Sequence, residues 1–403
     1  MKLATLAALT AALSLVTCGD PATPIAGPAP GVGAPQAVLT AADGEVVMSE
    51  LHNPRGLAFG PDGALFVAEA GTGPEPGTVV PNADCVTIVA TLYCYGATGS
   101  ISRLLDGVQE RVVTGLPSVA APNGQAQGPD GLSIGGYGQA YVTIGLETDP
   151  RKRTTPRLQQ LARIVRLSAA ALRGNGGGHR PDQWEFIADP GSYEIATNPD
   201  CGLIDSDPFG LLAEPDGLII ADAGANSFFR LDRTGELSTF LPMQSRNTMP
   251  LHDGCPLPAG YPTVQPKETV PTSIVKGADG TYYIGQLAGV PITAGAAKVY
   301  RWVPGSDPEV WLTGFTYIIA MAFDDAQNLY VLQYTNGINP VPPGGLLPGS
   351  VVRVAPDGTR ETVITGIRSA TGLAIGPDGA IYVTQYGAKT RQLPLGEVLR
   401  FTL

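Results

Sequence analysis

Six positions of the chain follow one local pattern and could do chemistry together. Each stands at the end of a short apolar run, as in "ALFVAE" and "LIIAD". Five of the six are acids or amides, and the set is Glu69, Ile144, Asp222, Gln286, Gln333 and Gln385. Two carboxylates and three amides, if brought together, could surround a cation or a polyhydroxylated ligand. The same groups could instead bind neighbouring backbone and hold the fold together, so both uses stay open.

A second set of positions lies just before other apolar runs, and it bears on hydrolase chemistry. The set is Arg55, Asp130, Phe209, Thr272, Ile319 and Thr371. A metal-dependent hydrolase needs acids and amides there to hold Ca²⁺ or Zn²⁺, which activates water or polarises a carbonyl. Only Asp130 of this set is an acid, with Asn53 and Asp207 close by in sequence. The metal candidates are therefore weak: Glu69, Asp130 and Asp222, with Ca²⁺ as the ion they would take. The sequence establishes no cofactor, and Ca²⁺ stays open.

Other catalytic signatures are missing from the sequence. His52, His179 and His252 stand far apart, and there is no His-Glu-x-x-His. The Gly-x-Ser-x-Gly match at 131–135 lies in a repeated unit that is typical of a β-hairpin, so it does not form a strand-to-helix nucleophile elbow. The net charge of −11, without a long basic run, argues against a nucleic-acid partner. The sequence favours a protein that is not an enzyme, although a hydrolase stays open as the alternative.

A repeated phrase shows which elements must position these residues. "GLAFGPDGALFVAE" from Gly56 returns as "GLAIGPDGAIYVTQ" from Gly372, and four more copies start at Gly131, Gly210, Ser273 and Ala320. Each copy has two apolar runs around a turn rich in Gly, Asp and Pro, which is typical of a β-hairpin. A third run with a basic residue follows, as in "SISRLL", and usually a fourth, as in "ERVVTGL". The unit therefore has four strands.

Six such units predict an all-β, six-bladed β-propeller over residues 44–403. The last unit has three strands, and an unassigned run, "GEVVMSEL" at 44–51, precedes the first. We expect 44–51 to pair with 396–403 and close the ring. The insertions of the first three units, including 71–96, should be loops on one face. Both polar sets would meet there, so we expect a small molecule or a protein to bind this face of a monomer.

The start of the chain is typical of an exported protein. Residues 1–18 have one Lys and a short apolar run, which predicts a signal peptide. "LVTC", ending at Cys18, is similar to a lipoprotein cleavage box, so Cys18 would be acylated and give the only link to a membrane. Ordinary cleavage further on is the alternative. Residues 19–43, rich in Pro, Ala and Gly, should form a tether. The protein would then be in the cell envelope, the periplasm or the extracellular space.

The four other cysteines suit an oxidising compartment. Proximity favours the pairs Cys85–Cys94 and Cys201–Cys255, out of the three pairings that four cysteines allow. A zinc site is the alternative, but the sequence contains no Cys-x-x-Cys.

Three stretches resemble the ScyD/ScyE family of exported bacterial propellers. They are "NPRGLAFGPDGALFVAEAG", "NPDCGLIDSDPFGLLAEPDGLIIADAGANSFFRLD" and "VPTSIVKGADGTYYIGQLAG". The resemblance covers about residues 44–403 and implies a propeller akin to NHL-repeat and gluconolactonase-type folds, but it implies little about activity. In NHL-type blades the Asp of "ADAGAN" holds backbone, which here would be Asp222 with Asn226. Hydrolysis of lactones or esters is the alternative function. Quinone-dependent sugar dehydrogenases share the repeated phrase, but their His and Arg residues cannot be placed here.

Overall fold

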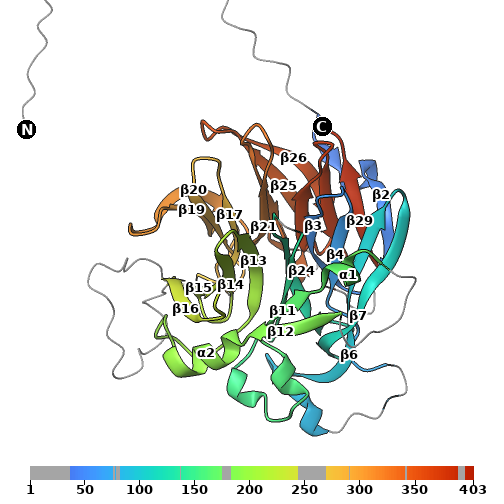
Figure 1. The fold of residues 1–403 in the computed structure, drawn as a ribbon. Helices are drawn as coiled ribbons and strands as arrows, with labels where there is room; N and C mark the ends of the chain where they lie inside the picture. Colours follow the sequence, from blue (N-terminus) through green and yellow to red (C-terminus); the bar gives the residue numbers. More distant parts are fainter. Residues whose placement is uncertain are drawn as a thin grey trace, which may run out of the picture. The chain divides into compact units, whose positions relative to one another are not determined.

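Six antiparallel sheets of four strands stand around one axis in the computed structural model of this chain (Figure 1). The structure describes residues 37–75, 78, 82–136, 138–174, 183–243, 269–289, 291–340, 343–388 and 395–403. The first strand of each blade is innermost, and each inner strand contacts the inner strand of the next blade until the last contacts the first. The prediction of a six-bladed β-propeller is confirmed.

The strands of each blade follow one another in the chain, with one exception in the last blade. From the axis outward, the first blade has β3 (Pro54–Phe59), β4 (Leu65–Glu69), β6 (Thr91–Leu105) and β7 (Val108–Ala120), and the second has β9 (Pro129–Ile134), β10 (Ala140–Ile144), β11 (Arg163–Leu167) and β12 (Trp184–Ala188). The third has β13 (Pro208–Glu214), β14 (Gly217–Asp222), β15 (Ser227–Asp232) and β16 (Leu237–Pro242), and the fourth has β17 (Pro271–Lys276), β18 (Tyr282–Gln286), β19 (Ala297–Trp302) and β20 (Glu309–Phe315). The fifth has β21 (Ile318–Phe323), β22 (Leu329–Gln333), β25 (Gly349–Val354) and β26 (Arg360–Ile367), and the last has β27 (Gly372–Ile375), β28 (Ile381–Gln385), β29 (Gly396–Phe401) and β2 (Glu45–Leu51).

The last blade takes its outer strand from the beginning of the propeller. Strand β2 pairs antiparallel with β29, with Glu45 opposite Arg400 and Val46 opposite Leu399. Figure 1 shows the two strands side by side, one blue and one red. The predicted pairing of 44–51 with 396–403 is therefore confirmed.

A short strand before β2 extends the neighbouring blade. Strand β1 (Leu39–Thr40) pairs in parallel with β26, and the 3₁₀ helix η1 (Ala41–Asp43) leads from it to β2. The end of the expected tether thus already contacts the ring. The expected signal peptide, Cys18 and most of the tether lie outside the described residues.

Apolar side chains fill the spaces between blades, as the alternation along the strands requires. Between the last blade and the first, Met48 and Leu51 of β2 pack with Leu57 and Val67 of the first blade and Val398 of β29. Each blade buries its faces only against its two neighbours, so closing the ring completes the core.

The insertion at 71–96 is not simply a loop, as the sequence analysis expected. Strand β5 (Cys85–Ile88) pairs with an extended β6, and a disulfide joins Cys85 to Cys94 across this pair. Val86, Ile88 and Tyr93 are buried, which gives the hairpin an apolar side. The predicted Cys85–Cys94 disulfide is confirmed. The predicted Cys201–Cys255 pair cannot be compared, because Cys255 lies outside the described residues.

Most of the longer connections lie on one face of the ring, which we call the loop-bearing face. Connections from second to third strands and from one blade to the next emerge there, because strand direction alternates within each blade. These connections contain the 3₁₀ helices η2 (Asn82–Asp84), η3 (Pro150–Lys152) and η4 (Leu158–Gln160) and the helix α2 (Pro190–Thr197). They also contain the hairpin of β23 (Ile338–Pro340) and β24 (Pro343–Leu346). Strand β8 (Ala126–Gln127) lies in the connection from the first blade to the second. Helix α1 (Ala169–Leu172) follows β11 and lies on the opposite face. Among the described helices, none has the length and apolar character of a membrane span.

Candidate functional site

Glu69 ends β4 on the loop-bearing face, and the protein itself saturates its carboxylate. The side chain is fully buried and accepts hydrogen bonds from the backbone N–H of His52 (2.6 Å) and the hydroxyl of Ser102 (2.6 Å). The Arg111 guanidinium adds Nε and a terminal nitrogen at 3.0 and 2.9 Å. Glu69 therefore ties the turn before β3 to the outer strands of its blade.

Asp222 and Asn226 hold the backbone around the third blade. Asp222 accepts hydrogen bonds from the Ser206 hydroxyl (2.7 Å) and from the N–H groups of Asp207 (2.6 Å) and Ala225 (3.0 Å). Burial outweighs these bonds and raises the pKa of Asp222 to about 6. Asn226 donates to Asp200 at 3.2 Å and accepts from the N–H of Val270 at 2.9 Å.

The three amides of the set are bonded in similar ways. Gln286 accepts from the Tyr300 hydroxyl (2.7 Å), Gln333 accepts from the N–H of Thr316 (2.6 Å), and Gln385 donates to Glu397 (2.7 Å). Among the described residues around the central cavity, none comes from the set Glu69, Ile144, Asp222, Gln286, Gln333 and Gln385. The structure puts these positions on one face but spreads them among the blades.

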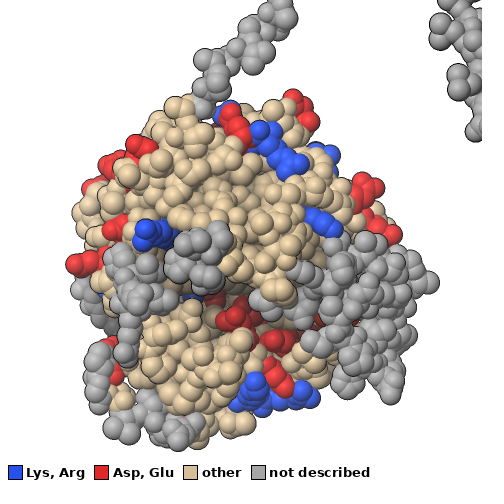
Figure 2. All heavy atoms as spheres, turned by 180° about the vertical axis from the view of Figure 1, so that it is seen from behind, with Lys and Arg blue, Asp and Glu red and all other residues tan. Residues whose placement is uncertain are grey.

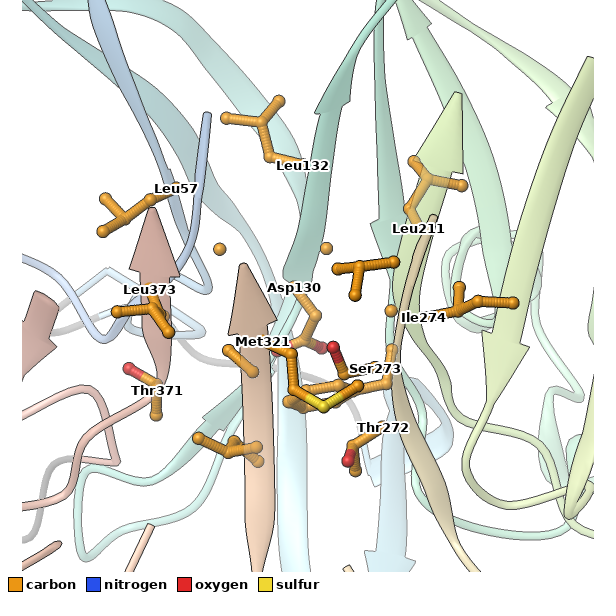
Figure 3. A pocket seen from close by; sticks show the side chains of 18 of the residues that line it. Leu57, Asp130, Leu132, Leu211, Thr272, Ser273, Ile274, Met321, Thr371 and Leu373 are labelled. Atoms are coloured by element: carbon orange, nitrogen blue, oxygen red, sulfur yellow. The ribbon is translucent and has the colours of Figure 1, made fainter. Parts of the chain in front are cut away.

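The second set does converge on the axis. A cavity of about 160 Å³ lies between the inner strands, and five of the six positions line it: Asp130, Phe209, Thr272, Ile319 and Thr371. Figure 3 shows Leu57, Leu132 and Leu211 towards one end of this cavity, Thr272 and Thr371 towards the other, and Asp130 between them. The cavity is mainly apolar, so Asp130 is the charged group that its lining contributes.

The sixth position, Arg55, forms an ion pair with Asp130 between the first two blades. Its Nε lies 2.8 Å from Oδ1 of Asp130, and its terminal nitrogens donate to the carbonyls of Ala126 (2.8 Å) and Gly387. The other oxygen of Asp130, Oδ2, has no hydrogen-bond partner among the described residues, and the side chain is 1% exposed. Burial raises the pKa of Asp130 to about 6 although Arg55 acts to lower it.

Other acceptor oxygens face Asp130 across Gly145. A Cβ placed on Gly145 would lie 2.4 Å from Oδ2 of Asp130, 2.7 Å from Oδ1 of Asp207 and 3.3 Å from Oε1 of Gln127. Only a glycine leaves room for these oxygens, because any side chain would collide with both carboxylates. The two carboxylate oxygens therefore lie within about 5 Å of each other. Burial, with the charges of Asp130 and Glu147, raises the pKa of Asp207 well above its usual value.

Glu147 lies at the surface next to this group, and it belongs to neither of the two polar sets. Its side chain is exposed and is hydrogen-bonded to the amide of Gln127. Its φ is 58°, in the left-handed region that a non-glycine residue enters at a cost. Desolvation nevertheless raises its pKa, so protein surrounds the carboxylate on several sides. Figure 2 shows a hollow on the molecule, seen from behind, where acidic side chains gather.

The metal candidates do not come together as a set. Among the described residues, no three His, Cys, Asp or Glu side chains are placed to hold a metal ion. Asn53, expected beside such a site, is buried and donates to the carbonyls of Gly71 (2.8 Å) and Gly124 (3.2 Å).

Sequence comparison assigns no family, because no family model and no curated protein matches the chain. Among solved structures, the chain is similar to a gluconolactonase from Xanthomonas campestris (10% identity over 88% of each chain, TM-score 0.46). It is also similar to a catalytically inactive virginiamycin B lyase from Staphylococcus aureus (14% identity, 89% of this chain and 98% of that one, TM-score 0.44). A third is a luciferin-regenerating enzyme (12% identity, 89% and 93%, TM-score 0.46). Identities and TM-scores this low carry no argument about activity.

A second buried acid lies on helix α2. Glu194 is fully buried, and neither of its carboxylate oxygens has a hydrogen-bond partner among the described residues. Burial, followed by the charges of Asp222, Asp200 and Asp205, raises the pKa of Glu194 to about 9. Glu194 is therefore a neutral acid near pH 7.

The sequence holds one signal that could have led to Glu147. Glu147 follows Ile144, the apolar member of the first set, by three residues, in the phrase "IGLETDP". In the second blade, the acid therefore stands three residues after the strand end and not at it. An alignment that compares the same position in every repeat does not include Glu147.

Proposed function

We propose that this protein is an exported, non-catalytic propeller that binds a small polar ligand on its loop-bearing face. The binding site is the group of Glu147, Gln127, Asp130, Asp207 and Arg55, which we call the acidic mouth. The proposal also includes a monomer with a signal peptide at 1–18, and kinship with the ScyD/ScyE family.

One observation carries the assignment of the site. Asp130 keeps an oxygen without a hydrogen-bond partner among the described residues. It interacts electrostatically with Glu147, an exposed residue whose backbone conformation is costly. Donors from their own blades engage the carboxylates of Glu69 and Asp222. The acidic mouth therefore keeps carboxylate oxygens that can accept hydrogen bonds from a ligand.

Export is supported by chemistry rather than by any direct measurement. The Cys85–Cys94 disulfide suits an oxidising compartment, and the first eighteen residues have the composition of a signal peptide. Acylation of Cys18 would add a lipid anchor. Mass spectrometry of the mature protein from a bacterial envelope fraction would test both steps, because each changes the mass of its N-terminal peptide.

Thermal unfolding with a ligand panel tests the binding site. Sugars, polyols, amino acids and amines would be screened against the wild type, Glu147→Gln and Glu185→Gln. Glu185 lies on β12 of the same blade in an exposed ion pair with Arg166, so its variant matches the charge change away from the mouth. A compound at 100 times its Kd stabilises the wild type by about 2.7 kcal/mol. We expect this stabilisation in Glu185→Gln and its loss in Glu147→Gln. Equal stabilisation of all three proteins would contradict the site.

The alternative is a metal-dependent lactonase or esterase. In its favour, Asp130 has a pKa of about 6 and lies beside Asp207, so it could exchange a proton near neutral pH. We expect neither Ca²⁺ nor Zn²⁺ to raise the melting temperature, and we expect lactone hydrolysis to be no faster than with Asp130→Asn. Metal-dependent stabilisation together with hydrolysis that Asp130→Asn abolishes would replace the binding proposal.

A further inference from the structure

We infer that the ligand of the acidic mouth is an organic cation, bound through the N–H donors of an ammonium or guanidinium group. This inference rests on the proposed binding function and names its ligand class.

The acidic mouth has more carboxylates than cations. Asp130, Glu147 and Asp207 lie together with one guanidinium, that of Arg55. Each nitrogen of Arg55 donates one hydrogen bond, to Asp130 or to the carbonyls of Ala126 and Gly387, so three of its five N–H groups are engaged. The excess of negative charge must be balanced by protons or by another cation.

The acceptor oxygens also lie close together with few donors, since Oδ1 of Asp207 accepts the backbone N–H of Leu146 at 3.0 Å. Oδ2 of Asp130, Oδ1 of Asp207 and Oε1 of Gln127 converge beside Gly145. Oδ2 of Asp130 is buried and has no hydrogen-bond partner among the described residues. Acceptors in such an arrangement favour a ligand that brings donors and positive charge.

The titration of these groups agrees with this geometry. Burial raises the pKa values of Asp130, Glu147 and Asp207, and the charge of Glu147 adds to the effect on the two aspartates. Tyr93 also has a raised pKa because of its burial and the charge of Glu147. A bound cation would relieve the repulsion that these groups share.

A metal ion fits the site less well than an organic cation. Within the described part of the chain, no three acidic, His or Cys side chains are placed to hold a metal. An ammonium or guanidinium group needs only one or two carboxylates and an amide oxygen, which Glu147, Asp207 and Gln127 supply.

Matched charged and uncharged probes test the inference. Calorimetric titration at pH 7.5 would compare n-butylamine, which is protonated there, with n-butanol and with myo-inositol. The proteins would be the wild type, Glu147→Gln and the control Glu185→Gln. We expect n-butylamine to bind the wild type about tenfold more tightly than n-butanol. Glu147→Gln should remove about that factor, and Glu185→Gln should not change it.

The outcomes separate this inference from the proposed function. If n-butanol or myo-inositol binds as tightly as n-butylamine, and Glu147→Gln weakens that binding, the acidic mouth is the site but the ligand is not a cation. If n-butylamine binds all three proteins equally, both the site and the ligand class are wrong. Absence of n-butylamine binding to the wild type overturns the cation inference.

Discussion

The buried carboxylates of this propeller differ in whether donors face their oxygens. Glu69 is saturated by His52, Ser102 and Arg111, so it is buried as part of a bonded network. Asp130 is bonded through one oxygen only, and Glu194 through neither, among the described residues. A buried carboxyl without donors is stable chiefly when it is protonated. The first kind therefore holds structure, and the second kind is sensitive to pH or to a ligand.

Glu194 should make the stability of the protein depend on pH. Its pKa is raised from about 4.5 to about 9 in the folded state, so folding takes up a proton between these values. The stabilisation from the neutral acid is complete below pH 4.5 and is lost as pH rises towards 9. We expect Glu194→Gln, which stays neutral, to be more stable than the wild type at pH 8 and similar to it at pH 4. The difference should grow by at most about 1.4 kcal/mol per pH unit, as measured by urea unfolding from pH 4 to pH 9.

A suitable control is Glu185→Gln, because Glu185 is an exposed acid on β12. Its unfolding free energy should follow the wild type across the whole pH range. A constant difference between Glu194→Gln and the wild type would mean that Glu194 is charged in the folded protein.

Among the elements, β2 has an unusual place because it completes a blade from the other end of the chain. Met48 and Leu51 are buried and Val46 is half exposed. The two buried residues are three positions apart because the register with β29 shifts between them, so strict alternation does not hold here. Its partner β29 already pairs with β28, so without β2 the edge of β29 would be open.

Two substitutions on β2 should therefore have very different effects. Leu51→Ala removes a fully buried side chain from the space between the last and the first blade, and should lower the unfolding free energy by about 2–5 kcal/mol. Val46→Ala changes a side chain that is 52% exposed and should cost less than about 0.5 kcal/mol. Urea unfolding followed by tryptophan fluorescence measures both. Equal losses would mean that β2 does not pack as a core strand.

At the scale of the whole molecule, we expect stability to depend on the closed ring and not on where in the ring the chain begins and ends. A Cβ on Gly44 would lie 2.6 Å from the ring of Phe401, so the start of β2 and the end of β29 are neighbours. Three residues, Thr402, Leu403 and Gly44, would suffice to join them as a hairpin. Asp106 and Gly107, both with positive φ, form the turn between β6 and β7, where the ring could be opened instead.

A circular permutant tests this expectation. The variant joins Leu403 to Gly44 and begins at Gly107, so that β7 closes the first blade as β2 closes the last in the natural order. We expect it to keep the β-rich circular dichroism spectrum and cooperative unfolding. A truncation that begins at Asn53, without β2, should lose cooperative unfolding. A permutant that fails to fold while the truncation folds would contradict closure as the source of stability.

The repeat predicted the propeller because every unit contains the pattern of a complete hairpin, from "GLAFGPDGALFVAE" in the first unit to "GLAIGPDGAIYVTQ" in the last. The set of residues around the cavity was also predictable, since one register of an inner strand faces the axis in each blade. The resemblance led us to expect that Asp222 binds backbone, and it accepts the N–H groups of Asp207 and Ala225. The Arg111 donor of Glu69 was not predictable, because its distance along the chain says nothing about contact. Glu147 and Gly145 were missed because both lie past the strand end at which the repeats are aligned. Their role depends on where a connection folds back on Asp207.

The pairing of Glu45 with Arg400 also sets the order of events during synthesis. The two residues are 355 positions apart, and β2 is among the first propeller strands to leave the ribosome. Until β29 has been synthesised, β2 has no strand edge with which to pair, and one face of the first blade stays uncovered. The last folding step of a nascent chain therefore joins strands from the two ends of the propeller, and it cannot begin before β29 has been synthesised.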